Sequence, residues 1–240
     1  TPLKDWDIQI NYGIKTGFNE AFIISTEKRD EILSNCQSDD ERKRTAELIR
    51  PILRGRDIKR YGYDWANLWL INTHNGVKGK YPPIDINDYP AVKQHLDLYW
   101  DKISRRDDKG ITPYNLRNCA YMEDFSRPKI VYPETTQGAY FAFDDKGLFI
   151  DKTGFMLISD EAQYLQHTLS SRLFEFAYKN IFSSIELGEH GYQYNKHAFV
   201  KLPVLKCSDS SILNDVQDID MKIYTLYDIS EDEIRFIESR

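Results

Sequence analysis

The sequence predicts an α+β protein with a mixed, mainly antiparallel sheet, flanking helices and a C-terminal helical tail. Two observations support this fold class. Short apolar runs of strand length recur between turn residues, and longer stretches carry apolar side chains three or four positions apart. A third observation sets the tail apart, because its apolar residues follow only the helical spacing. We therefore expect one domain over residues 1–205 and a helical tail over residues 206–240, which packs on that domain or on a partner.

The first part of the chain mixes strands and helices. Residues 8–12 alternate apolar and polar side chains as a strand does, and a glycine turn over residues 13–17 separates them from a second apolar run, residues 21–24. We expect these two strands to pair across the turn. Thr26 can cap a short helix that ends near Leu33.

A stronger helix is expected after Asp39 or Asp40, either of which can cap it. Pro51 must end or kink this helix, because proline has no amide hydrogen to donate. A short buried strand over residues 68–71 and a helix over residues 89–103 are expected next. The apolar stripe of the first helix comprises Ala46, Ile49 and Leu53.

In the second half, strand-like runs precede a long helix. Residues 144–147, Asp-Asp-Lys-Gly, have the composition of a tight turn, so we expect the runs on either side to form a hairpin. The long helix is expected over residues 161–178. The strand-like runs are residues 129–132, 139–143, 148–150 and 155–158.

The tail contains a heptad-like seam, which is typical of a helix that packs on another helix. Ser230 and Glu233 form a capping box, and this box begins a last helix that buries Ile234 and Ile237. The seam comprises Ile212, Val216, Ile219, Ile223 and Leu226.

The composition excludes several classes of protein. The chain is 41% apolar and 29% charged, as folded globular chains are, and no apolar run reaches the roughly 18–20 residues of a membrane helix. Cys36, Cys119 and Cys207 are odd in number and far apart, so we expect no disulfide framework and a cytoplasmic location. The histidines are scattered and no Cys-x-x-Cys pair is present, so we expect no metal site.

The net charge of −6 argues mildly against a nucleic-acid partner, but the charge is unevenly distributed. Residues 207–240 carry nine acidic and three basic residues, so the tail holds the whole excess. Residues 1–206 are neutral in sum, and within them residues 41–60 carry eight basic and three acidic residues. The net charge of −6 is therefore the sum of a basic segment, an acidic tail and a remainder of mixed charge.

The known catalytic motifs are missing from the sequence. It has no phosphate-binding loop, no dinucleotide glycine motif and no Gly-x-Ser-x-Gly elbow. Pro133-Glu134 followed by Asp144-Asp145-Lys146 imitates a magnesium-dependent nuclease, but a turn also explains the second triplet. We expect no catalytic residue in this chain and rank the nuclease below the binding functions.

Residues 13–19, GIKTGFN, form a candidate binding loop. Glycines allow a backbone to approach a ligand closely, and the Lys15 ammonium and Thr16 hydroxyl suit a phosphate oxygen. An ordinary loop between strands is the alternative. Residues 50–60, RPILRGRDIKR, place five cations around one carboxylate, and arginine recognises phosphates and guanine edges bidentately. A solvated face, or an internal ion pair of Asp57 with one arginine, is the alternative there.

Several segments together resemble the TaqI-like C-terminal specificity domain, the target-recognition domain of fused type II restriction-modification adenine methyltransferases. This family is related to type I specificity subunits. The segments are GIKTGFNEAFII (13–24), RPILRGRDIKRY (50–61), RPKIVYPE (127–134), the long helix (164–178), KLPV (201–204) and DIDMKIYTLYDISEDEIRFIE (218–238).

The resemblance implies that this chain recognises double-stranded DNA for an upstream adenine-N6 methyltransferase domain. That domain would bind S-adenosylmethionine and flip the target adenine, and a magnesium-dependent nuclease can precede it in the parent. The family's catalytic and cofactor motifs are missing here, so the chemistry is expected elsewhere, with no cofactor in this fragment. The matched motifs can instead be scaffold, and a module that only docks a methyltransferase is the rival function. The expected DNA contacts are Lys15, Thr16, Asn19, Arg54, Arg56, Lys59 and Arg60, followed by Arg105, Arg106, Arg117, Lys129 and Gln137.

Overall fold

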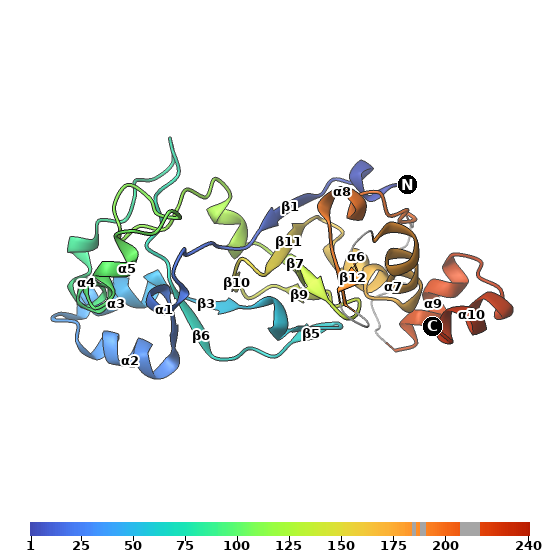
Figure 1. Ribbon diagram of the computed structural model, residues 1–240, viewed down its shortest axis with the longest axis horizontal. Helices are drawn as coiled ribbons and strands as arrows, with labels where there is room; N and C mark the ends of the chain where they lie inside the picture. The colour runs from blue at the N-terminus through green and yellow to red at the C-terminus, as the bar shows by residue number, and fades with distance from the viewer. Residues whose placement is uncertain (184–185, 188–190, 207–216) are drawn as a thin grey trace.

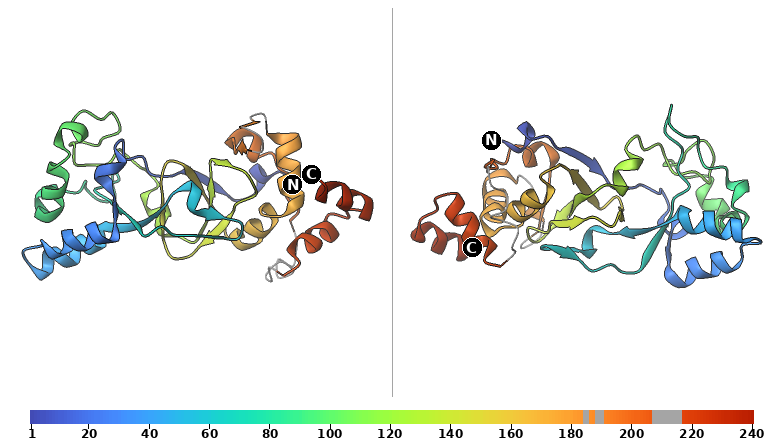
Figure 2. Two further views of the ribbon diagram at one scale, coloured as in Figure 1. Left: turned by 60° about the horizontal axis from the view of Figure 1, so that its bottom comes forward. Right: turned by 180° about the vertical axis from the view of Figure 1, so that it is seen from behind.

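The computed structural model describes residues 1–183, 186–187, 191–206 and 217–240. They form an elongated molecule, with strands in the middle and a group of helices at each end (Figure 1). The views from below and from behind keep this division (Figure 2). Helices and mainly antiparallel sheets therefore build the α+β fold that the sequence predicts.

An antiparallel sheet with the strand order β1-β11-β7-β9 lies at the centre. Strand β1 pairs with β11 through Gln9 and Ile158, and not with residues 21–24 as expected. The expected pair is wrong because residues 19–22 form a helical turn and the following strand joins another sheet. The strands are β1 (Gln9–Tyr12), β7 (Lys129–Pro133), β9 (Ala142–Asp144) and β11 (Gly154–Ile158).

A second sheet has the order β10-β3-β6-β2, and β10 runs parallel to β3. The hairpin expected around residues 144–147 is therefore wrong, because the strands on its two sides belong to different sheets. The carboxylate of Asp144 accepts hydrogen bonds from the amides of Lys146 and Leu148, and so directs the chain from one sheet to the other. The strands are β2 (Ile23–Ser25), β3 (Ile49–Leu53), β6 (Leu68–Ile71) and β10 (Phe149–Ile150).

Two small sheets and several 3-10 turns complete the centre. Strand β13 joins β12 to β8, and β4 pairs with β5. These strands are β4 (Ile58–Lys59), β5 (Gly62–Tyr63), β8 (Thr135–Thr136), β12 (Glu186–Leu187) and β13 (Gly191–Gln193). The 3-10 turns are Leu3–Asp5, Gly55–Asp57, Ile86–Asp88 and Met122–Ser126.

The helices of one end differ from expectation in their limits. Ser25 and Ser38 cap the second and third of them, in place of the expected Thr26 and aspartates. The third helix ends at Leu48, and the apolar residues expected to extend its stripe form β3 instead, where Ile49 pairs with β6 and Leu53 with β10. The expected helix over 89–103 is divided in two. The helices are α1 (Asn19–Phe22), α2 (Thr26–Ser34), α3 (Asp39–Leu48), α4 (Pro90–Asp97) and α5 (Trp100–Ile103).

The other end begins with the predicted long helix, which is also divided. Helix α6 (Ala162–Leu169) stops before Ser171, whose hydroxyl accepts the amide of Phe174 and caps α7 (Arg172–Ala177). A π-helical turn (Tyr178–Phe182) continues α7, and α8 (Lys196–Phe199) follows.

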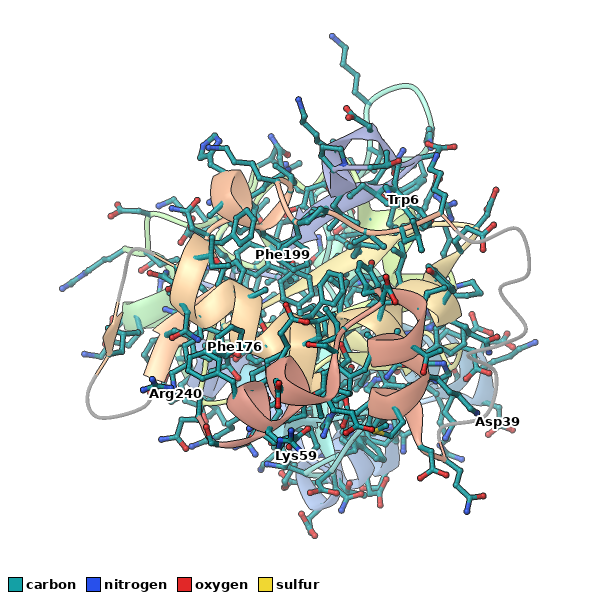
Figure 3. The ribbon with its side chains drawn as sticks, turned by 90° about the vertical axis from the view of Figure 1, so that its right-hand side faces the viewer. Trp6, Asp39, Lys59, Phe176, Phe199 and Arg240 are labelled. Atoms are coloured by element: carbon teal, nitrogen blue, oxygen red, sulfur yellow. The ribbon has the colours of Figure 1, made fainter. Side chains whose placement is uncertain are left out.

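The described residues bury two hydrophobic clusters. One lies beneath the second sheet and α2–α4, and Phe22, Ile52 and Leu96 have no exposed surface there. The other is rich in aromatic rings between the first sheet and the α6–α8 end. In that cluster the ring of fully buried Phe199 stacks on Tyr132, and Figure 3 places Phe199 near the middle of this end.

The tail comprises α9 (Ile219–Leu226) and α10 (Glu231–Glu238), and it contributes Ile219 and Ile223 to the second cluster. Ile212 and Val216 of the predicted seam lie outside the described residues. The capping box of Ser230 and Glu233 is confirmed. Whether residues 1–205 and 206–240 are separate domains stays a prediction.

Candidate nucleic-acid interface

Two arginines of the basic segment form ion pairs within the protein. The Nε and Nη2 atoms of Arg54 donate to the Asp57 carboxylate at 2.9 and 2.6 Å, across the turn that Gly55–Asp57 makes. This is the internal ion pair that the sequence left open as an alternative. Arg60 donates from Nη2 to both carboxylate oxygens of Asp220 at 2.8 Å and from Nε to the Ser170 carbonyl. Arg60 thus joins the basic segment to the acidic tail.

A buried arginine, Arg106, supports the glycine loop by hydrogen bonding to its backbone. Arg106 is only 7% exposed, and it donates to the carbonyls of Thr16, Pro113 and Asn115 while its guanidinium lies 4.2 Å from the Phe22 ring centroid. Burial lowers the pKa of Arg106 to about 10, because desolvation disfavours its charged form. The structure therefore assigns Arg106 to support of the loop, in place of the expected DNA contact.

Thr16 has the same supporting role. Its side chain is buried and donates to Oδ1 of Asn19 at 2.5 Å, so the hydroxyl is not available to a phosphate. Lys15, directly before Thr16, is exposed and has no hydrogen-bond or ion-pair partner among the described residues. The loop therefore presents Lys15 and Asn19 outward and keeps Thr16 inside.

Lys129 and Asp144 form a fully buried ion pair, with Nζ 2.6 Å from Oδ2. Burial lowers the pKa of Lys129, and its ammonium also donates to the Phe125 carbonyl. A side chain without exposed surface has no face to offer to DNA, so Lys129 belongs to the scaffold. The same pair explains the nuclease-like pattern, because Asp144 holds Lys129 and the turn after β9 while Glu134 accepts from Gln193.

A groove of about 500 Å³, which we name the central groove, gathers three of the predicted residues: Asn19, Arg54 and Arg56. An adjoining hollow of about 310 Å³ shares Arg56 and Thr135 with it and adds Gln137. Asn19, Arg56 and Gln137 are all exposed. Segments far apart in the sequence thus bring three base-reading types of side chain to one place.

The remaining candidates lie elsewhere. Lys15 and Arg117 line one hollow of about 330 Å³, where Arg117 also pairs with Asp108 at 2.9 Å. Lys59 is exposed and donates to the Arg56 carbonyl, and Arg105 is exposed beside the buried Arg106. The structure thus gathers the predicted residues into two groups and leaves Lys59 and Arg105 apart.

Two hollows next to that of Lys15 are lined by four lysines that no sequence pattern singled out, Lys4, Lys78, Lys80 and Lys196. No charge run points to them, because only Lys78 and Lys80 are close together in the sequence. Thr135 and Thr153 of the central groove were also missed, and neither lies in a motif. Within the described ranges no cluster of three potential metal ligands occurs, and no helix is both apolar and long enough to cross a membrane.

Residues 50–204 match the family described as the TaqI-like C-terminal specificity domain. This match covers more than half of the chain, so the protein belongs to that family, and the predicted resemblance is confirmed. Membership supports a role in DNA target recognition within a methyltransferase system.

Three proteins are among those that resemble the chain. The type II methyltransferase M.BanIII of Aneurinibacillus aneurinilyticus is 23% identical over 163 residues, which are 63% of this chain and 26% of that protein. The type IIL restriction-modification enzyme MmeI, solved in complex with DNA, has a TM-score of 0.68 at 13% identity, over the whole of this chain and 36% of that enzyme. The type IIG restriction endonuclease BpuSI has a TM-score of 0.56 at 15% identity, over 93% of this chain and 26% of that enzyme. The two structures confirm the fold class, and the chain spans about a quarter of the curated relative.

Proposed function

We propose that this chain recognises the DNA target of a restriction-modification methyltransferase, while catalysis occurs in another part of the parent protein. Membership of the specificity-domain family and the likeness to a type II methyltransferase support this proposal. The likeness to MmeI, which was solved in complex with DNA, supports duplex DNA as the partner.

We also propose the finer chemistry of the parent. It would transfer a methyl group from S-adenosylmethionine to N6 of adenine, after flipping that base out of the duplex. An upstream methyltransferase domain would be the protein partner of this chain, and a magnesium-dependent nuclease would be a second activity of some parents. The free thiols of Cys36 and Cys119 support a cytoplasmic location.

The side chains that line the central groove and its adjoining hollow are the main structural support for base recognition. Arginine pairs bidentately with guanine, and asparagine and glutamine pair bidentately with adenine, in the major groove. Arg56, Asn19 and Gln137 supply these three donor types from exposed positions. Thr135, at the boundary of the two hollows, adds a hydroxyl that can donate or accept.

Selection from a pool of duplexes with a randomised centre tests the proposal. The 240-residue chain should enrich one short sequence motif. The variant Arg56→Ala with Gln137→Ala should lose preference at the positions these residues read, because each bidentate pair contributes about 1–3 kcal/mol of discrimination. Lys43→Ala, an exposed lysine on α3 outside the groove, is the matched control and should select the same motif as the unchanged protein. No enrichment by the unchanged chain would contradict the function.

A further inference from the structure

We propose that the main phosphate-binding surface of this chain is a basic trough on one long edge of the molecule, and not the basic segment 50–60. This inference rests on the proposed DNA-recognition function and names the surface that performs it. The trough consists of the three hollows that meet at Ala120. Its charged side chains are Lys4, Lys15, Lys78, Lys80, Arg117 and Lys196, with Glu123 and Asp124.

The three hollows are continuous. Their volumes are about 590, 670 and 330 Å³, and Ala120 lines all of them. The first and second share Lys80, and the first and third share Tyr121. In Figure 1 the elements that line them, β1, α8 and the teal loop near residue 80, lie along the upper edge of the molecule. A long, shallow, continuous surface of this kind can follow a nucleic-acid backbone.

The trough is positively charged, although the whole chain has a net charge of −6. Six basic and two acidic side chains line it. Both acids are paired, and Lys80 and Arg117 are paired as well, so among the described residues the uncompensated positive charge belongs to Lys4, Lys15, Lys78 and Lys196. Glu123 pairs with Lys80, and Asp124 pairs with Arg127 at 3.3 Å and accepts the Asn11 amide. Within the described part of the chain, no carboxylate pairs with the exposed lysines at positions 4, 15 and 78. These ammonium groups are therefore free to neutralise phosphates.

A projecting loop carries Lys78 to the end of the trough. The amides of Val77 and Lys80 donate to the carbonyls of Tyr81 and Val77, and so close a tight turn. Gly79 has φ +81°, the left-handed conformation that glycine adopts at the third position of a type II turn. No atom lies within 4 Å of the position that a Gly79 side chain would occupy, so the tip is open to a partner. This is the teal loop that projects at the upper left of Figure 1.

The basic segment is less suited than the trough to bind phosphates. Arg54 and Arg60 are held by Asp57 and Asp220, and the central groove that contains Arg56 also contains the carboxylates of Glu134 and Asp151. Seen along the long axis, Lys59 lies near the bottom of the molecule and Trp6, close to Lys4 in the chain, lies near the top (Figure 3). The two candidate surfaces can therefore be separated by mutation.

Three double charge reversals in the 240-residue chain test the proposal. Lys15→Glu with Lys78→Glu alters the trough, Arg56→Glu with Lys59→Glu alters the basic segment, and Lys43→Glu with Lys102→Glu alters exposed positions on α3 and α5 as a control. Each variant changes the net charge equally. The affinity for mixed-sequence duplex DNA is measured over a series of salt concentrations, with thermal unfolding to verify that each variant is folded.

We expect the trough variant to lose affinity on the order of tenfold or more, and the magnitude of its log–log salt slope to fall by about 2, roughly 0.9 for each lost phosphate contact. The control variant should retain the slope, and the basic-segment variant should lose at most about 0.9 of it, because only Arg56 of its two cations faces DNA in the proposed function. If the basic-segment variant loses the slope and the trough variant keeps it, the trough is overturned while DNA recognition stands. If the unchanged chain shows no salt-dependent binding to any duplex, the proposed function and the trough both fail.

Discussion

Lys129 forms a buried ion pair with Asp144, although it was expected to contact DNA. In sequence it is a cation before an apolar run, but in the structure its ammonium and the Asp144 carboxylate have no exposed surface. A buried pair of this kind holds its two strands in place, because either partner alone would be an uncompensated charge in the interior. Lys129 connects β7 to the turn that follows β9.

Replacing Lys129 with methionine should lower the free energy of unfolding by about 3–5 kcal/mol, because Asp144 would remain buried without its partner. Urea unfolding measures this change. The double variant Lys129→Met with Asp144→Asn should recover part of the loss, since the amide oxygen can still accept one of the two backbone amides. A single variant as stable as the unchanged protein would contradict the assigned role.

The loop over residues 13–19 shows why a motif can be shared for structural reasons. A Cβ on Gly13 would overlap the backbone carbonyl of Asp151, because the loop pairs with the end of β10 through the Ile14 amide and the Ile150 carbonyl. Arg106 supports the same loop from beneath. The motif is thus needed to position Lys15 and Asn19, although few of its atoms face outward.

Gly13→Ala should therefore destabilise the protein by more than about 2 kcal/mol, at the upper end of what single substitutions cause. Gly62→Ala in β5 is the matched control, because no atom lies within 4 Å of its Cβ position and its φ is not left-handed. Thermal unfolding of both variants provides the comparison. Equal melting temperatures for the two would show that the close approach at Gly13 does not matter for stability.

Several strands could be located from the sequence, because a short run of apolar residues indicates a buried strand. The runs that became β1, β6, β7 and β11 were identified because each is bounded by polar or turn residues. Their partners were not predictable, since β1 pairs with β11 from the far half of the chain. Ile49 and Leu53 satisfy helical and extended spacing equally, and only pairing with β6 and β10 decides for a strand.

At the scale of the whole molecule, local charge counts gave a poor picture of the candidate interface. The basic segment was conspicuous in sequence, but the partner of Arg60 is Asp220 in the tail, which no local window contains. The trough was invisible, because its cations come from five separate segments and only folding assembles them. What the sequence could predict was the family and several members of each group, not their surroundings.

The Arg60–Asp220 pair leads to a prediction that separates tail docking from DNA binding. Asp220 also accepts the amide of Arg172, so it ties α9 both to the basic segment and to the start of α7. Arg60→Ala should lower the free energy of unfolding by about 1.5–3 kcal/mol, the usual range for a hydrogen bond to a charged group, and should increase hydrogen exchange in α9.

The same variant should retain nearly all of the salt slope of DNA binding, because the Arg60 guanidinium is already neutralised in the folded protein. Lys15→Ala is its counterpart: it should leave α9 exchange unchanged and reduce the magnitude of the slope by about 0.9, since its ammonium is exposed and unpaired within the described residues. If Arg60→Ala instead lost slope with no change in α9 exchange, Arg60 would belong to the DNA-binding surface and the tail would be held by other contacts. If Arg60→Ala changes only α9 exchange and Lys15→Ala changes only the salt slope, the two cations have different roles. Arg60 then holds the acidic tail on the domain, and Lys15 binds DNA phosphates.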